Sequence, residues 1–484
     1  MQITDIFQNL LSISPIGIDD NFFELGGDSL LAINLQVELL KLNLNITYSD
    51  IFIKPTVREL ATKISSSEAY VSNSIDTNEF LGFNTILDNT CNMPQKLESI
   101  ELENILITGT TGFLGAHVLD NFLKTEKGIA YCLIRTESGL TLENKLIKKL
   151  HFYFGDKYDK YIGNRIIIVN GDIVKNNLGL SSEELNSIAN NISCVINCAA
   201  KVTHFGNYNA YKEVNVDGTE NLLKFCTQFN KRFYQVSTLS VSGNNLENQS
   251  YMEQSFEHDV IFRENNFYIN QSLDNVYVRS KFEAEKLVLQ YILKGLDAYI
   301  LRVGNLMNRY EDGKFQPNVD ENAYIDRLLS LTKIGCIPDY LSNNYLEFTP
   351  IDSCAEAIIK IVKHPNKENR IFHLYDNNHV DVIEFIRVLN KYIPFDIVSN
   401  DEFVNKVNNI FKQKNSDTIL SGILRDFDVN RRLVYESKVK LRSEFTIEYL
   451  SKIGFKWPNI DEKYLVKFLD YFCSTGYIKR EEKK

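Results

Sequence analysis

From residue 104 onward, short apolar and β-branched runs alternate along the chain with amphipathic patterns of helical spacing. The apolar runs are typical of buried strands, and the patterns between them are typical of helices. Strands that alternate with helices predict an α/β, Rossmann-like doubly wound parallel sheet with right-handed crossovers, here over residues 104–304. The predicted strands are residues 105–108, 129–134, 165–169, 194–199, 232–237 and 298–303.

The region after residue 305 has a different pattern, mainly helical and irregular. We expect it to form a C-terminal lobe over residues 305–484 that covers the substrate. Its aromatic residues are of the kind that mostly fill a core, so the pattern identifies no specificity residue. The predicted helices are residues 324–331, 354–362, 382–392, 402–411 and 462–472.

The first 64 residues form a separate small unit of predicted helices. Ile6, Leu10 and Leu11 lie on one face of a short helix, and a second helical pattern starts at Leu30. Residues 65–103 are rich in Ser, Asn, Thr and Asp, a composition that cannot bury enough surface to fold alone. We expect a linker with a small docking segment, which raises the effective concentration of the first unit at the second.

Composition places the chain among globular proteins of more than one domain. Its 484 residues are too many for one ordinary core, and 44% are hydrophobic while 24% are charged. The net charge of −10, without a basic stripe, argues against a nucleic-acid partner. No apolar run is long enough for a membrane helix, and the first residues lack the features of a signal peptide. We therefore expect a cytoplasmic protein without a membrane partner.

The eight cysteines are scattered and lack the paired spacing of a metal site, so no metal is expected. Cys194 and Cys198 lie in an apolar run and are expected to be packed thiols. Free thiols of this kind are typical of a reducing compartment.

Glycines follow the first predicted strand of the sheet and precede a helix. Gly109 permits a tight turn, Gly112 lets the backbone approach a pyrophosphate, and Gly115 lets helix and strand pack closely. The helix N-terminus adds free N–H groups and a partial positive charge. This pattern predicts a dinucleotide site. The cofactor contacts expected here are Gly109, Thr111, Gly112, Phe113, Leu114 and Gly115.

The ends of the following strands carry further candidate cofactor contacts. Arg135 ends the second strand, where a basic residue suits the 2′-phosphate of NADP and an acidic one would suit NAD. Lys145 on the next helix is a second candidate cation, with Lys148 and Lys149 as alternatives. After the third strand, Asp172 can accept a hydrogen bond from an adenine amino group, although it can equally cap a loop. The remaining contacts expected at these strand ends are Ile173, Ala199, Ala200 and Lys201.

A tyrosine and a lysine four residues apart open a later helix. Tyr277 and Lys281 share one helical face, so the ammonium can lower the tyrosine pKa and also hold a ribose hydroxyl. Such a pair is common by chance, but here it follows a fifth strand that ends in Ser237 and Thr238. The spacing resembles that of extended short-chain dehydrogenases/reductases. The resemblance implies that Thr238 orients the carbonyl, Tyr277 donates the proton, and Lys281 positions Tyr277 and the cofactor.

The N-terminal unit carries paired glycines followed by Asp28, Ser29 and Leu30 at a helix start. This stretch resembles the peptidyl carrier domains of nonribosomal peptide synthetases, which are small four-helix domains. The resemblance covers residues 4–64 and sets the expected domain boundary at 64. It implies that Ser29 carries 4′-phosphopantetheine, attached by a separate phosphopantetheinyl transferase.

Four stretches, residues 108–115, 212–219, 237–243 and 302–307, resemble the terminal thioester reductase domains of the same synthetases. The resemblance implies that NADPH reduces a carrier-bound peptidyl or acyl thioester through a hemithioacetal to an aldehyde, and in some members to an alcohol. It also implies upstream adenylation and condensation domains as partners. Asn308 departs from the family, where glycine is frequent. The cofactor contacts implied by the last two stretches are Ser237, Gly304, Asn305 and Leu306.

Three other functions remain open from the sequence. The closing half of a carboxylic acid reductase would use the same chemistry on an acid activated elsewhere. A nucleotide-sugar epimerase or dehydratase would share the fold without net reduction, although a fused carrier argues against it. A catalytically inactive module that only docks a carrier is opposed by the presence of Thr238, Tyr277 and Lys281.

Overall fold

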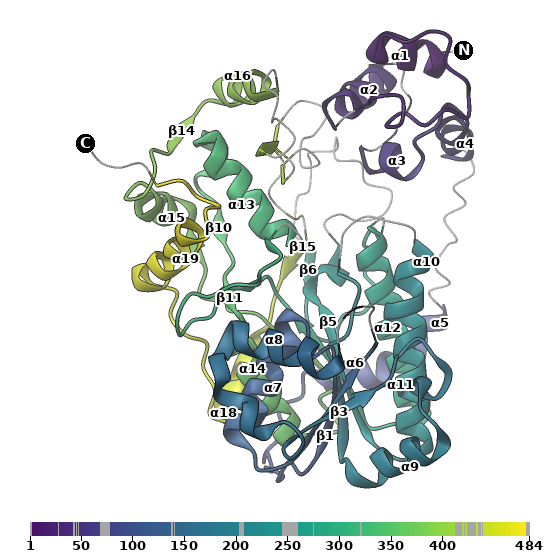
Figure 1. Cartoon of the computed structure of the whole chain (residues 1–484), viewed down its shortest axis with the longest axis vertical. Helices are drawn as coiled ribbons and strands as arrows, with labels where there is room; N and C mark the ends of the chain where they lie inside the picture. The colour runs from purple at the N-terminus through teal and green to yellow at the C-terminus, as the bar shows by residue number, and fades with distance from the viewer. Residues whose placement is uncertain are drawn as a thin grey trace.

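The computed structural model (Figure 1) describes residues 2–27, 29–41, 44, 46, 48–67, 78–136, 139, 141–202, 208–243, 260–273, 275–319, 322–411, 419–420, 422–423, 432–433, 437 and 439–480. Within these ranges, every helix is too short or too polar to cross a bilayer.

The N-terminal domain is a small bundle around an apolar core. Phe7, Phe22, Leu35, Ile51 and Leu60 are fully buried there. α4 continues past residue 64, so the last helix of the bundle enters the segment expected to be linker. The helices are α1 (Gln2–Leu11), α2 (Ser29–Lys41), α3 (Tyr48–Ile53) and α4 (Val57–Ser67), drawn in purple in Figure 1.

The part of the chain before residue 104 where we expect a docking segment contains α5 (Asn78–Leu81) and α6 (Asn84–Thr90). Phe80 and Phe83 are buried, and their rings lie 5.2 and 5.5 Å from the ring of Phe267 in the larger domain. These contacts attach the end of the expected linker to the core of the sheet domain, so α5 and α6 are part of that folded domain.

The larger domain contains one parallel sheet of seven strands in the order β12-β7-β5-β4-β1-β2-β3. Six of the strands are those predicted from the apolar runs, while β12 comes from the region expected to be the helical lobe. Residues of β1 alternate between the two faces, because Ile105 and Ile107 contact one core cluster and Leu106 the other. The strands are β1 (Ile105–Thr108), β2 (Ala130–Ile134), β3 (Ile166–Asn170), β4 (Cys194–Asn197), β5 (Arg232–Thr238), β7 (Ala298–Val303) and β12 (Ile371–Leu374).

Helices cover both faces of the sheet, as expected for an all-parallel sheet (Figure 1). One face carries α7 (Phe113–Thr125), α8 (Leu142–Phe154), α14 (Ile351–Lys363) and α18 (Glu444–Lys452). The other face carries α9 (Ser182–Asn191), α11 (Gly218–Gln228) and α12 (Val276–Leu293). Because β12, α14 and α18 lie beyond residue 305, the chain returns to the sheet domain after it has entered the C-terminal lobe.

The C-terminal lobe has a second apolar core, in which Phe348, Phe385 and Phe468 are buried. All five helices predicted after residue 305 are confirmed, one of them as α14 on the sheet. Asn308, the residue that departs from the family, is fully buried and donates from Nδ2 to the Gly313 carbonyl at 2.6 Å, so its side chain braces the turn that enters the lobe. The lobe helices are α13 (Ala323–Ile334), α15 (Val382–Leu389), α16 (Asn400–Phe411) and α19 (Glu462–Ser474).

Short strand pairs and irregular turns connect these parts. The pairs are β8 (Leu306–Met307) with β11 (Thr349–Pro350), β10 (Tyr345–Leu346) with β13 (Val380–Asp381), β9 (Cys336–Pro338) with β14 (Asp396–Val398), and β6 (Val260–Phe262) with β15 (Val439–Leu441). The short helices among the described residues are α10 (Tyr208–Tyr211), the π-helical η3 (Lys212–Asp217), and the 3-10 helices η1 (Gly155–Tyr161), η2 (Asn176–Gly179), η4 (Leu239–Ser242) and η6 (Asp339–Leu341).

Candidate active site

The glycine loop between β1 and α7 is a tight cradle. Gly109 has a left-handed φ of 72°, and a Cβ there would lie 2.7 Å from the Ala199 nitrogen. A Cβ on Gly115 would lie 2.2 Å from the Gly109 carbonyl oxygen. Gly112 is the N-cap of α7 and provides no side-chain cap, which leaves the first N–H groups of the helix for another acceptor. The loop therefore fits the pyrophosphate of a dinucleotide.

Buried hydrogen bonds join the carboxyl ends of three neighbouring strands beside this loop. Thr108 of β1 donates to Asn197 Oδ1 of β4 at 2.5 Å, and Asn197 Nδ2 donates to Gln235 Oε1 of β5 at 2.9 Å. The Ala199 N–H in turn donates to Thr108 Oγ1 at 3.2 Å. These contacts place Ala199 beside Gly109, at the point where the strand order reverses and where ligands of such sheets bind.

Two predicted cofactor contacts of the glycine loop have side chains that pack in the core. The Phe113 ring lies 5.8 Å from the ring of Tyr153 and 5.1 Å from the ring of Phe315, so it joins the cores of the sheet domain and the lobe. Leu114 is buried on the sheet. Phe113 and Leu114 would therefore bind a cofactor through their main-chain N–H groups, and the main-chain N–H group of Thr111 would act with them.

The candidates for adenosine recognition lie at the carboxyl ends of β2 and β3. Arg135 is exposed directly after β2, and Lys145 is half-buried on α8. Asp172 Oδ1 accepts a hydrogen bond from the Val174 N–H at 3.2 Å, so the side chain caps its loop, as the sequence allowed. Asp172 is half-exposed. The Ile173 side chain is buried.

A polar side chain that the pattern did not single out links the end of β4 to α12. Asn215, in a π-helical turn of η3, is nearly inaccessible. Its Oδ1 accepts from the Lys201 N–H at 2.8 Å, and its Nδ2 donates to Ser280 Oγ at 2.9 Å. Residue 215 lies in the family-like stretch 212–219, but only the fold brings it to the site. It holds Lys201, and with it the preceding Ala200, in place relative to α12.

The hydroxyl groups of Thr238 and Tyr277 meet where β5 ends and α12 begins. Their side chains form a hydrogen bond with each other. The side chain of Asn275 caps α12 by accepting from the Tyr277 N–H at 2.9 Å, which fixes the first turn. Burial raises the pKa of Tyr277 to about 12, although the hydrogen bond with Thr238 lowers it, so the phenol is protonated at neutral pH.

Lys281 points from α12 to the carbonyl of Val236 and donates to it at 2.6 Å. Burial lowers the pKa of Lys281 to about 8, although Glu285 and Cys198 both raise it. The sequence predicts that Lys281 lowers the pKa of Tyr277. The structure differs, because desolvation of the phenol raises this pKa and the influence that lowers it is the hydrogen bond to Thr238, not the charge of Lys281.

The hydroxyl group of Ser237 lies on the opposite side of β5 from that of Thr238. The Ser237 hydroxyl donates to Glu285 Oε1 at 2.5 Å inside the core, so it is turned away from the Tyr277 hydroxyl. Alternation along an extended strand sends neighbouring side chains to opposite faces, which is why only one of the two hydroxyls reaches the site. A cofactor contact of Ser237 would therefore come from its main chain.

The loop after β7 is held by a carboxylate that the sequence pattern did not reveal. Glu347 accepts from the Asn305 N–H at 2.8 Å and from Asn305 Nδ2 at 2.9 Å. A Cβ on Gly304 would lie 2.1 Å from Glu347 Oε1 and 2.5 Å from the Cβ of Tyr375, so a side chain there would displace the carboxylate and collide with Tyr375. Leu306 begins β8. Of the predicted contacts in this loop, Asn305 already uses its amide group within the protein.

The predicted modification site is the first residue of α2. Gly26 has a left-handed φ of 97°, and a Cβ on Gly27 would lie 2.4 Å from the buried ring of Phe22, so both glycines before the helix are required. Ser29 follows at the helix start, whereas Asp28 lies outside the described residues. A helix N-terminus tolerates the negative charge of a phosphodiester.

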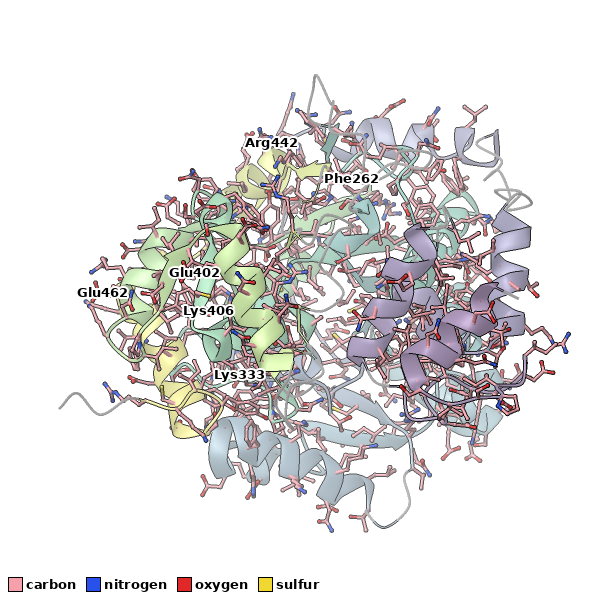
Figure 2. The ribbon with its side chains drawn as sticks, turned by 90° about the horizontal axis from the view of Figure 1, so that it is seen from above. Phe262, Lys333, Glu402, Lys406, Arg442 and Glu462 are labelled. Atoms are coloured by element: carbon pink, nitrogen blue, oxygen red, sulfur yellow. The ribbon has the colours of Figure 1, made fainter. Side chains whose placement is uncertain are left out.

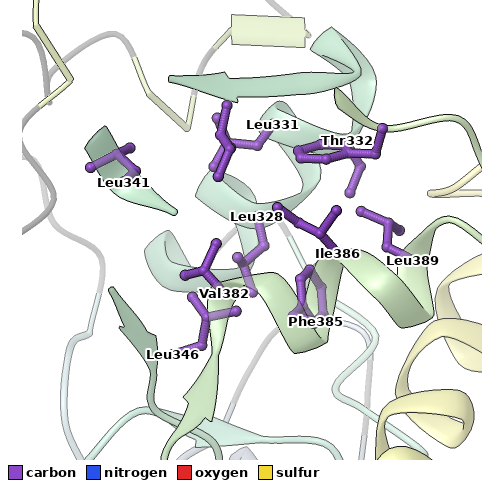
Figure 3. A pocket seen from close by; sticks show the side chains of 11 residues that line it. Leu328, Leu331, Thr332, Leu341, Leu346, Val382, Phe385, Ile386 and Leu389 are labelled. Carbon is purple, nitrogen blue, oxygen red and sulfur yellow. The ribbon is translucent and has the colours of Figure 1, made fainter. Parts of the chain in front are cut away.

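An apolar cavity of about 30 Å³ lies in the core of the C-terminal lobe (Figure 3). Leu328, Leu346, Val382, Phe385 and Ile386 line it, together with further side chains of α13 and α15. Apart from the Thr332 hydroxyl, the side chains that line it are hydrocarbon, and none of them is an acid or a base, so the reaction is not expected at this cavity.

Comparison with known proteins identifies both domains. The NAD-binding family described as "Male sterility protein" matches residues 107–358, and the family described as "Phosphopantetheine attachment site" matches residues 2–64. The structure of a thiolation-reductase di-domain from an archaeal non-ribosomal peptide synthetase is similar to the chain, with 34% identity and a TM-score of 0.80. That match covers 99% of this chain and 97% of the other.

Two curated relatives are much longer than this chain. A linear gramicidin synthase protein of Brevibacillus parabrevis is 28% identical over 97% of this chain, which corresponds to 9% of that protein. An L-2-aminoadipate reductase of Candida glabrata is 24% identical over 81% of this chain and 30% of its own length. The predicted resemblance to a carrier domain joined to a reductase is confirmed: the chain belongs to the NAD-binding "Male sterility protein" family and has the arrangement of a nonribosomal peptide synthetase thiolation-reductase di-domain.

Proposed function

We propose that this chain reduces a peptidyl or acyl thioester, carried on phosphopantetheine at Ser29, and releases it as an aldehyde. The observation that carries the proposal is the meeting of the Thr238 and Tyr277 hydroxyls beside the glycine cradle, in one chain with a carrier domain. Neither feature alone would indicate reductive release, because the fold also serves reactions without net reduction.

NADPH, when bound, supplies the hydride. Gly109, Gly112 and Gly115 would hold its pyrophosphate, and Arg135 would bind the 2′-phosphate. The latter assignment rests on the exposed position of Arg135 directly after β2, the strand next to the glycine loop.

The protein's own groups act on the thioester carbonyl oxygen. Thr238 and Tyr277 donate hydrogen bonds to this oxygen as it gains negative charge. The raised pKa of Tyr277 keeps its proton in place until the oxygen becomes basic enough to accept it. Collapse of the resulting hemithioacetal restores a carbonyl and expels the pantetheine thiol, so one hydride and one proton are consumed for each aldehyde formed. Lys281 holds the end of β5 and would hold the cofactor ribose.

The partners follow from this chemistry. A phosphopantetheinyl transferase would modify Ser29, and upstream adenylation and condensation domains would load the carrier. A protein similar to the L-2-aminoadipate reductase of Candida glabrata would instead load a single acid. The reductase chemistry is the same in both cases.

The test is single-turnover reduction of a loaded carrier. The full chain is modified with an acyl-pantetheine by a transferase, NADPH is added, and the product is identified by mass spectrometry. We expect an aldehyde from the wild type, and a rate about 10²–10⁴-fold lower for Tyr277→Phe. Tyr345→Phe, which removes a hydroxyl from an exposed tyrosine of the lobe, should leave the rate unchanged. Acid instead of aldehyde, or a wild-type rate for Tyr277→Phe, would contradict the proposal.

A further inference from the structure

The catalytic helix α12 carries a third ionisable residue on the face that bears Tyr277 and Lys281. Glu285 follows Lys281 by one turn, so the three side chains are aligned along the helix. Lys281 is 3% exposed and Glu285 is fully buried. A buried carboxylate is retained at a cost unless it is paired, so its partners indicate what it does.

Glu285 and Lys281 together hold the two residues that precede Thr238. Lys281 donates to the Val236 carbonyl at 2.6 Å, and Glu285 accepts from the Ser237 hydroxyl at 2.5 Å. Two consecutive residues of β5 are thus attached to one side of α12. Because Thr238 is the next residue and Tyr277 lies in the first turn of the same helix, these bonds set the distance between the two catalytic hydroxyls.

Glu285 is itself held by Arg302 of β7. Arg302 Nε lies 3.1 Å from both carboxylate oxygens, and its Nη2 donates to Oε2 at 2.8 Å. The other guanidinium nitrogen donates to the Asn266 carbonyl at 3.0 Å and lies 3.2 Å from His373 Nε2. Both members of the ion pair are completely buried, so neither can exchange its partner for water.

The neighbouring strands enclose this ion pair. The Phe262 ring of β6 lies 4.9 Å from the Arg302 guanidinium, and Phe262 and Arg442 lie side by side in Figure 2. His373 Nδ1 lies 2.8 Å from the Arg442 carbonyl. Burial and Arg302 hold the pKa of His373 well below its usual range, so the imidazole is neutral, donates from Nδ1 to that carbonyl and accepts at Nε2 from Arg302.

The ionisable groups around Lys281 come from each element packed near it. α12 contributes Glu285 and the protonated Tyr277, the end of β4 contributes the Cys198 thiol, β7 contributes Arg302, and β12 contributes the neutral His373 behind that arginine. The π-helical turn η3 presents the uncharged Asn215 to this part of α12. Glu285 is the only carboxylate among these groups, and it favours the protonated form of Lys281.

We propose that Glu285 is a positioning residue which, anchored by Arg302, fixes the end of β5 through Ser237, next to the Val236 carbonyl that Lys281 binds, and stabilises the positive charge of Lys281 during the reaction. This inference rests on the proposed function, in which Thr238, Tyr277 and Lys281 act on the thioester and the cofactor. It adds a residue that touches none of the reacting groups and acts through two that do.

Replacing Glu285 by glutamine keeps the size of the side chain and removes its charge. The proton on Lys281 then loses its attraction and faces an unpaired Arg302, so it should dissociate at lower pH. Since an opposite charge one helical turn away shifts a pKa by about one unit or more, the alkaline limb of single-turnover reduction should move down by at least about one pH unit. The pH at which NADPH binding weakens should move with it.

A purely structural role is tested by a second variant. Glu285→Gln alone leaves a buried arginine unpaired and is expected to lower the melting temperature. The double variant Glu285→Gln/Arg302→Met removes both charges and should recover most of that loss. If Glu285 acts only on stability, the double variant regains the wild-type pH profile. We expect the profile to stay shifted, because Lys281 still lacks its carboxylate.

The experiment uses the full chain with its carrier loaded, and Glu283→Gln serves as the matched control. Glu283 lies on the same helix but pairs with Arg279 near the surface, so its variant should keep the wild-type profile. Wild-type pH profiles for both reduction and NADPH binding in the single and double Glu285 variants would overturn the inference. NADPH binding is measured without thioester, so it does not depend on the proposed reaction. If the pH profile of NADPH binding shifts in the Glu285 variants while Tyr277→Phe reduces the thioester at the wild-type rate, the proposed function has failed and the role of Glu285 holds.

Discussion

The substitution Gly115→Ala tests the cradle that the glycine loop forms. The new Cβ would stand 2.2 Å from the Gly109 carbonyl oxygen, where ordinary contact begins near 3.4 Å, so the loop or the helix must move by about 1 Å. The obstacle is a backbone atom that cannot rotate away as a side chain would. Forcing atoms into a packed site costs about 1–3 kcal/mol, whereas alanine in place of glycine stabilises a helix by about 1 kcal/mol. We therefore expect a net loss of up to about 2 kcal/mol in the free energy of unfolding.

The same movement displaces the first N–H groups of α7 from the pyrophosphate. A hydrogen bond to a charged group contributes about 1.5–3 kcal/mol, so the loss of one raises the Kd for NADPH by roughly 10- to 150-fold. Fluorescence titration with NADPH measures the Kd, and calorimetry measures the melting temperature. The substitution leaves the neighbouring residues Thr108 and Ala199 as they are, so a lower affinity for NADPH reports on the glycine loop itself.

Gly82→Ala is the control for this experiment. It adds the same methyl group between α5 and α6, where the nearest atom is Leu293 Cδ1 at 3.6 Å. Affinity and melting temperature should both match the wild type. If Gly115→Ala binds NADPH as tightly as the wild type and melts at the same or a higher temperature, the loop is not a rigid cradle and the assignment of the cofactor site is wrong.

Three further predictions concern other parts of the site. Ser29→Ala should keep NADPH binding but gain no mass with a carrier transferase and coenzyme A, and any mass gain would show a second modification site. Arg135→Ala should reduce the preference for NADPH over NADH by roughly 10- to 150-fold, and an unchanged ratio of the two Kd values would exclude Arg135 as the phosphate contact. Thr238→Ala should lower the rate of thioester reduction by about 10²-fold or more with unchanged NADPH affinity, because it removes a hydrogen-bond donor to the oxyanion, and an unchanged rate would remove Thr238 from the site.

The sequence by itself determined the features that depend on neighbours along the chain. Six of the seven sheet strands were predicted because a buried parallel strand is a continuous apolar run, whatever lies beside it. The left-handed φ of Gly109 and the close approach of Gly115 to the Gly109 carbonyl likewise belong to a turn of a few residues, whereas the contact of Gly109 with Ala199 does not. The spacing of Tyr277 and Lys281 placed both on one face of α12, since helical periodicity is a local property.

Only the tertiary structure decided which distant groups meet and how burial changes their chemistry. β12 was missed because its short apolar run lies within a mainly helical region, and it becomes a strand only by pairing with β7. The carboxylates of Glu285 and Glu347 bind Arg302 and Asn305, which lie 17 and 42 residues away along the chain. The sequence predicts a lowered pKa for Tyr277, and this prediction is wrong for the same reason. The spacing shows that a lysine is near, whereas desolvation depends on all the groups that pack around the phenol.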